Sequence, residues 1–328
     1  MMRRPLRHGA RALAAVSLVL LLGAAEPKGK PPPREAPCSL PGMIDDLRSA
    51  LLDGSPALRK YMKLLLKEAA LSMPTGELRA AFAAERDPQV LEVLGAALAG
   101  RASRDQEIAL IEPVLDRART DSNPALRAGA LRGLRGTGSV EIMAKTGGGS
   151  YESFVRDPSP EVRAAAVDNL IQENAEVYFG HDGAVSEAAV KAAAACSDPA
   201  LAAKLLSTMS MEKAGPEAVR TLIEKLGSES AELRAAAARA LGGASGEQAS
   251  AATRALLERY RVETDHGVRA AILEGVVHLG LGGARATLES LRGVDPALAK
   301  EIDAWLKVLA MSLQEWTIIL REKQRLQG

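Results

Sequence analysis

The sequence predicts an all-α protein in which about eight helical hairpins stack into an α-solenoid. The main observation is a phrase that recurs along the chain, as in SAELRAAAARALGG from Ser230, NPALRAGALRGLRG from Asn123 and SPEVRAAAVDNLIQ from Ser159. The composition agrees, because only 3% of the 328 residues are aromatic and alanine is abundant. Cores of Ala and Leu suit closely packed helices better than sheets, which favour β-branched and aromatic residues.

Each copy of the phrase begins like a helix. Three residues before its first aliphatic residue stands Ser, Asp or Asn, the residue types that cap helix N-termini. In six of the eight copies the next residue is Pro, which is favoured at the first helical position. The eight pairs of cap and aliphatic residue are Ser55 and Leu58, Asp87 and Val90, Asn123 and Leu126, Ser159 and Val162, Asp198 and Leu201, Ser230 and Leu233, Asp265 and Val268, and Asp295 and Leu298.

The remainder of each repeat predicts a hairpin. Apolar or small residues follow the first aliphatic residue at three, four and eight positions, which is one stripe of an amphipathic helix. Glycine often ends the phrase, as at Gly100, Gly136, Gly242 and Gly280, and suits a helix C-terminus. A second helical pattern precedes most copies. A single hairpin cannot bury its apolar face, whereas a stack can, so residues 42–310 are predicted to form the solenoid.

The phrase resembles the D-P-x-V-R-x-A-A-x-x-A-L-G pattern of HEAT repeats, especially the bacterial HEAT-like type, also called PBS-lyase-type repeats. The resemblance implies a right-handed α-solenoid. In that family the arginine commonly pairs with an acidic turn residue of a neighbouring unit, so a structural ladder is expected here in preference to a ligand site. The family position is occupied by Arg59, Arg127, Arg163, Arg234 and Arg269, and departs from the pattern at Leu91, Ala202 and Ala299.

The N-terminal segment predicts export. Residues 1–25 combine four arginines with a 14-residue apolar run, Ala12 to Ala25, that ends in small residues. This pattern is typical of a cleaved signal peptide, with an uncleaved anchor as the alternative. Residues 26–41 contain six prolines and are predicted to be a stiff linker. The expected location is the bacterial periplasm or the medium.

The net charge argues against a nucleic-acid partner, and the positions of the two cysteines argue against a disulfide bond. The formal net charge of +1 falls to −3 when the four signal arginines are removed, too low for a basic DNA-binding groove. Cys38 lies in the linker and Cys196 lies several repeats away, so the two are not expected to pair.

No catalytic, cofactor or metal motif emerges. Lys145 precedes the glycines of AKTGGGS instead of following them, as a phosphate loop requires. The segment GLGGA from Gly280 follows a helix and not a strand, so it is no dinucleotide fingerprint. His181, His266 and His278 show no zinc-ligand spacing. We therefore expect no cofactor, no metal and, in all, a non-enzymatic protein.

Two groups of aromatic residues are candidate protein-binding sites. Tyr151, Phe154, Tyr178 and Phe179 lie where the repeat is irregular; the alternative is a plug of core residues between splayed helices. The segment from Ala304 predicts a long helical stretch with Trp305 and Trp316. It is expected to cap the last layer over residues 311–328, or alternatively to bind a partner.

The function expected from these features is a scaffold or adaptor that binds another protein in the cell envelope. The alternatives are a HEAT-like enzyme or enzyme accessory, because some members of the family resemble bilin lyases and others DNA glycosylases, and a structural protein that assembles with itself. The partner, its binding face and the oligomeric state are not indicated by the sequence.

Overall fold

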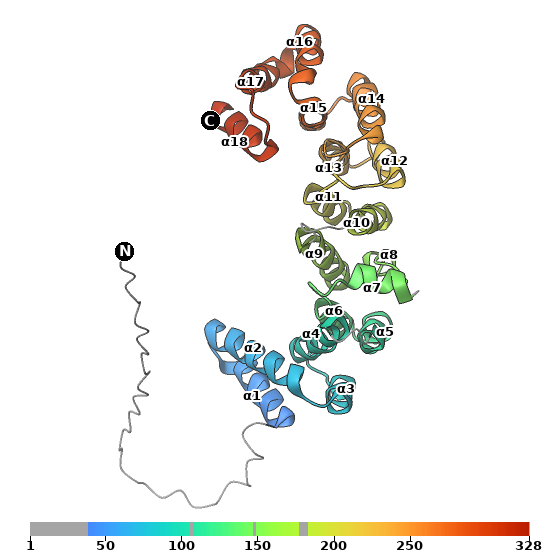
Figure 1. Cartoon of the computed structure of the whole chain (residues 1–328), viewed down its shortest axis with the longest axis vertical. Helices are drawn as coiled ribbons and strands as arrows, with labels where there is room; N and C mark the ends of the chain where they lie inside the picture. Colours follow the sequence, from blue (N-terminus) through green and yellow to red (C-terminus); the bar gives the residue numbers. More distant parts are fainter. Residues whose placement is uncertain (1–38, 105–107, 147–148, 177–182, 328) are drawn as a thin grey trace, which may run out of the picture.

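The computed structural model describes residues 39–104, 108–146, 149–176 and 183–327, and the regular structure of these residues is helical throughout. The all-α solenoid predicted from the sequence is confirmed. Figure 1 shows the helices stacked along a curved arc, with α1 and α2 near one end and α16 to α18 at the other. The predicted signal peptide, most of the linker, Cys38, Tyr178 and Phe179 lie outside the described residues.

Eight hairpins follow one another along the arc, each with an outer helix and an inner helix, and the inner helices contact one another in sequence order. Within the described residues, short 3₁₀ segments at Ile108–Leu110, Leu281–Ala284 and Pro296–Leu298 join or extend them. The hairpins are α1 (Leu40–Asp53) with α2 (Pro56–Ser72), α3 (Thr75–Ala84) with α4 (Pro88–Arg104), α5 (Glu112–Thr120) with α6 (Pro124–Arg132), α7 (Ser139–Thr146) and α8 (Glu152–Val155) with α9 (Pro160–Glu176), α10 (Ala184–Ala195) with α11 (Pro199–Ser207), α12 (Pro216–Lys225) with α13 (Ala231–Leu241), α14 (Glu247–Val262) with α15 (His266–Gly280), and α16 (Arg285–Val294) with α17 (Ala299–Leu309).

The predicted caps begin most of the inner helices. A side-chain oxygen accepts a backbone N–H of the first turn at Ser55, Asp87, Asn123, Asp198, Ser230 and Asp265. Asp295 differs, because its carboxylate accepts the Tyr260 hydroxyl and an Arg269 N–H, both at 2.8 Å. The eighth inner helix therefore starts late, at Ala299, after a 3₁₀ turn.

One continuous core runs through all the layers, from Leu40 in the first helix to Ile319 in the last, and consists mainly of Leu, Ala and Val. Small residues let adjacent inner helices approach closely. A Cβ atom on Gly275 would lie 2.5 Å from the Ala238 carbonyl oxygen, and one on Gly242 would lie 2.9 Å from the Gly275 Cα. Gly242 has an ordinary helical φ of −58°, so close packing, and not a left-handed cap, explains it.

The ends of the solenoid differ slightly from the predicted boundaries. Leu40 and Pro41, predicted in the linker, belong to α1, because Ser39 caps this helix and proline fits its first turn. At the C-terminus the predicted long helical stretch is divided. After α17 the chain turns through Ser312, at a left-handed φ of 55°, and α18 (Trp316–Gln327) returns along the inner side of the arc (Figure 1). Within the described residues, no helix is both long and apolar enough to cross a bilayer.

Candidate functional site

Three of the five ladder arginines pair with an acidic residue of the next hairpin. Arg127 lies 2.8 Å from Asp157, Arg234 lies 2.8 Å from Glu263 and Arg269 lies 2.8 Å from Asp295. The carboxylates are almost completely buried in the last two pairs, at 1% and 6% side-chain exposure. These arginines therefore join consecutive layers and leave no free guanidinium for a ligand.

Four acidic residues organise the turn before an inner helix. Each stands two residues before the cap, and its side chain accepts the backbone N–H of the cap residue. The sequence carries this signal as an acid at the second position before these four caps. The distances are 2.8 Å from Asp87 to Glu85, 3.0 Å from Asn123 to Asp121, 2.8 Å from Ser159 to Asp157 and 3.0 Å from Asp265 to Glu263.

These contacts keep the acids ionised. Burial alone would raise the pKa of Glu263, but hydrogen bonds from Arg234, the Asp265 backbone and Arg259 lower it to about 2. The pKa of Asp157 is also lowered, because hydrogen bonds from Arg127 and the Ser159 backbone outweigh its burial. Both groups are therefore charged across the physiological range and act as structural anions.

The remaining two arginines are not in such pairs. Cys196 occupies the position that an acid would take opposite Arg163, so Arg163 instead donates to the carbonyl oxygens of Asp157 at 2.9 Å and Pro158 at 3.0 Å. Its Nε is buried with no partner among the described residues. Arg59 is exposed on α2.

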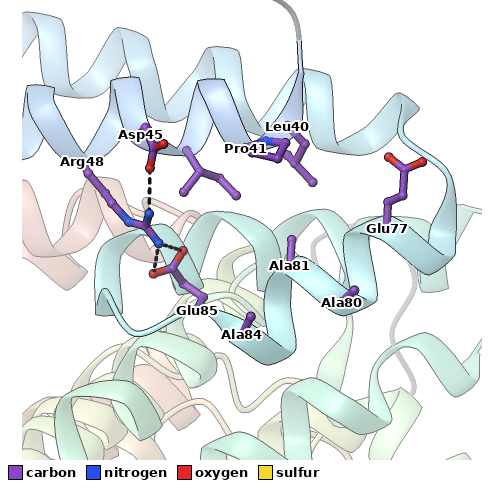
Figure 2. Close-up of a pocket in the computed structure, with 10 residues that line it drawn as sticks. Leu40, Pro41, Asp45, Arg48, Glu77, Ala80, Ala81, Ala84 and Glu85 are labelled. Atoms are coloured by element: carbon purple, nitrogen blue, oxygen red, sulfur yellow. Dashed lines mark hydrogen bonds and ion pairs between the residues drawn. The ribbon is translucent and has the colours of Figure 1, made fainter. Parts of the chain in front are cut away.

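A cleft of about 600 Å³ lies between α1 and α3, beside the carboxylate of Glu85. Figure 2 shows Ala80, Ala81 and Ala84 along one wall, with an ion-pair cluster at one end. In that cluster Arg48 binds Glu85 at 2.9 Å and Asp45 at 2.8 Å. Glu85, the carboxylate expected to meet Arg59, is thus neutralised by the outer helix instead.

Tyr151 and Phe154, two of the candidate binding residues, lie inside the core at 2% exposure each. The Tyr151 hydroxyl lies 2.7 Å from the Ser139 Oγ and accepts a 3.3 Å hydrogen bond from Asn169. Burial, aided by the charge of Glu173, raises the pKa of Tyr151. Of the four candidate aromatic residues, these two are therefore part of the core, as the alternative interpretation expects.

The two tryptophans meet, although they lie on different helices. Trp305 of α17 is fully buried, and its ring is nearly parallel to that of half-buried Trp316, with centroids 5.9 Å apart. Trp316 also stacks on His278 of α15 at 4.0 Å and 5°. Burial lowers the pKa of His278 to about 4, so the imidazole is neutral at pH 7. The stacked rings hold α18 against α15 and α17.

Helix α18 forms one wall of a cleft of about 680 Å³. The opposite wall is made by the C-terminal ends of successive inner helices, so the cleft follows the stacking direction. In its lining, Asn174 donates its Nδ2 to the Thr208 carbonyl at 3.2 Å, and its Oδ1 is buried with no partner among the described residues. The lining residues include Asn174, Leu206, Thr208 to Glu212, Arg239, Glu274, His278, Trp316, Thr317 and Leu320.

Charges on the inner helices are largely balanced between neighbours. Each listed pair joins a cation and an anion of different helices, so the described inner face has no continuous basic stripe of the kind that tracks a DNA backbone. No three metal-ligating side chains gather anywhere in the same residues. The pairs are Lys63 with Glu92 at 3.8 Å, Arg132 with Glu161 at 2.8 Å, Lys204 with Asp168 at 2.8 Å and Arg239 with Glu274 at 3.3 Å.

Comparison with known proteins identifies the repeat. A crystal structure of an engineered protein from the Northeast Structural Genomics Consortium is similar at a TM-score of 0.40, with 18% identity over 87% of this chain and 77% of that one. A second engineered protein from the same consortium gives a TM-score of 0.33, with 17% identity over 77% of this chain and 95% of that one. No curated protein matches. Residues 186–276, which span α11 to α14 and parts of α10 and α15, match the family model for HEAT repeats.

Proposed function

We propose that this protein is an exported, non-enzymatic scaffold that holds a segment of another protein in the cleft between the inner helices and α18. HEAT repeats indicate a scaffold of the protein-interaction type. The observation that carries the proposal is the cleft itself. The His278–Trp316–Trp305 stack fixes its α18 wall, and Trp316 and Leu320 face the C-terminal ends of successive inner helices across it.

The chemistry of this cleft suits an extended peptide. A peptide can form hydrogen bonds with exposed polar residues of the lining, such as Thr208 and Ser210, and its side chains can pack on Trp316 and Leu320. Tryptophan is enriched among residues that dominate binding energy, because it combines a large apolar surface with a polar edge. The charge-balanced inner face supports this reading over the nucleic-acid alternative.

The test is capture of a partner from an envelope extract with two arginine variants. Ser210→Arg places a long cation in the cleft, where it excludes a bound segment. Ser290→Arg makes the same change at an exposed position of α16, outside the cleft. We expect a stoichiometric protein partner to co-purify with the wild type and with Ser290→Arg, and to be lost with Ser210→Arg. Equal capture by both variants, or no partner at all, would contradict the proposal.

Export is tested separately. Cell fractionation and N-terminal sequencing of the purified protein should find it in the periplasm or medium, beginning near Glu26. A chain that retains residues 1–25 and sediments with membranes would support the uncleaved-anchor alternative instead.

A further inference from the structure

The first inner helix, α2, presents an apolar stripe to solvent. Leu58, Tyr61, Leu64 and Leu65 are 36% to 60% exposed, and their spacing places them on one side of the helix. Because α2 belongs to the first described hairpin, no earlier layer among the described residues packs on it. Terminal repeats usually cover the core with a polar face, so four large apolar side chains here require an explanation.

The same helix is strongly basic. Arg59, Lys60 and Lys67 are exposed and make no ion pair with any residue in the described part of the chain, and Lys63 is held by Glu92. The one acidic residue of α2 is Glu68. Elsewhere the inner helices balance their charges between neighbours, so α2 departs from the pattern of the solenoid.

We propose that α2 docks the protein on an anionic lipid surface. A helix with exposed leucines and a tyrosine on one side and lysines beside them is suited to lie in the interface of a bilayer, with its apolar residues among the acyl chains and its cations at the headgroups. A bilayer can bind the apolar stripe of a single exposed helix and needs no groove of matching shape.

Charge argues against a second copy as the occupant. Two α2 helices facing each other would bring their unpaired cations together, and like charges in contact oppose association. An anionic lipid surface instead pairs with the exposed cations Arg59, Lys60 and Lys67.

The experiment uses the chain from Glu26, which retains every helix of the structure, and vesicles of phosphatidylcholine with or without 30% phosphatidylglycerol. The test variant is Lys60→Glu with Tyr61→Ser, an adjacent exposed cation and apolar residue. Arg261→Glu with Val262→Ser is the matched control on α14, where both residues are also exposed.

We expect the wild type to sediment with anionic vesicles and not with neutral ones, and to be released by 0.5 M salt. The α2 variant should bind about tenfold more weakly, because it loses one cation and adds one anion, while the α14 variant binds like the wild type. Circular dichroism checks that both variants remain folded. Absence of wild-type binding to anionic vesicles, or equal binding by both variants, would overturn the proposal. So would a wild-type dimer that the α2 variant abolishes in sedimentation velocity, because the occupant would then be a second copy.

Discussion

At the scale of single residues, an acidic side chain two positions before the helix cap has two roles in four of the turns. In Glu85, Asp121, Asp157 and Glu263 this side chain accepts the backbone N–H of the cap residue and an arginine at the same time. One carboxylate therefore shapes the turn and pairs with a guanidinium. Cys196 occupies the equivalent position and supplies no carboxylate, so Arg163 donates hydrogen bonds to backbone carbonyl oxygens.

The first prediction restores this missing anion. Cys196→Asp should give Arg163 a carboxylate partner and stabilise the protein by about 1 kcal/mol at pH 7, measured by urea unfolding. The gain should disappear near pH 3, where the new carboxyl takes up a proton. Cys196→Asn is the control, similar in shape but uncharged, and an equal gain from it would show that charge is not responsible.

The second prediction removes an existing anion. Glu263→Gln leaves Arg234 and Arg259 without a buried carboxylate, and should lower the free energy of unfolding by about 3 kcal/mol. Glu274→Gln breaks the more exposed pair with Arg239 and should cost less than about 1 kcal/mol.

The pH dependence of stability should change in the same variant. Because the pKa of Glu263 is about 2 in the folded protein and about 4.5 in an unfolded chain, its contribution is complete above pH 4.5 and is lost as the pH falls toward 2. Between these values the wild type should lose stability more steeply than Glu263→Gln. Parallel curves would show that this carboxylate is not responsible.

At the scale of helices, two glycines and the aromatic stack determine how neighbouring helices pack. Gly242 and Gly275 allow α13 and α15 to approach until backbone contacts backbone. At the C-terminus, the turn at Ser312 brings α18 back so that Trp316 lies between Trp305 and His278. The amphipathic pattern predicts that these segments are helical, but the contact partners come from the packing.

The third prediction concerns the closest helix contact. In Gly275→Ala the new methyl would overlap the Ala238 carbonyl, so α13 and α15 must separate, and we expect a loss of about 2 kcal/mol in chemical denaturation. Gly293→Ala is the matched control, because no atom lies within 4 Å of its added Cβ. Helix propensity predicts that this control is neutral or stabilised by up to about 1 kcal/mol.

The fourth prediction tests the neutral imidazole of the stack. The pKa of His278 is about 4 when folded and 6.5 when free, so unfolding takes up a proton and stability falls as the pH drops from 6.5 toward 4. His278→Phe keeps a flat ring against Trp316 and removes this titration. Because the imidazole is partly exposed, we expect a difference of only about 1 kcal/mol between pH 7 and pH 4.5. Identical pH profiles of thermal unfolding for the wild type and His278→Phe would contradict this prediction.

At the scale of the whole molecule, the arc is a linear array in which each hairpin packs mainly on its neighbours. Stability in such arrays is approximately a sum of repeat and interface contributions, so local damage remains local. Both ends of the inner row differ from its middle: α2 exposes apolar residues at one end, while α18 covers the last layers at the other.

The fifth prediction follows from this linearity. In native-state hydrogen exchange, Gly275→Ala should accelerate exchange in α13 to α17 and leave α2 to α6 unchanged, because α9 and α11 separate these regions in the stack. A uniform acceleration over all helices would show that the array unfolds as a single cooperative unit.

The sequence by itself determined the class, the number of repeats and most helix starts, because caps such as Ser230 and the amphipathic stripe after them are local signals. It also placed the arginines, and their pairing was implied by the resemblance to HEAT repeats. Only the tertiary structure decided that Tyr151 and Phe154 are core, that Glu85 binds Arg48 and not Arg59, and that Trp316 meets His278. These outcomes depend on which surfaces become buried when layers stack, and a local pattern does not contain that information.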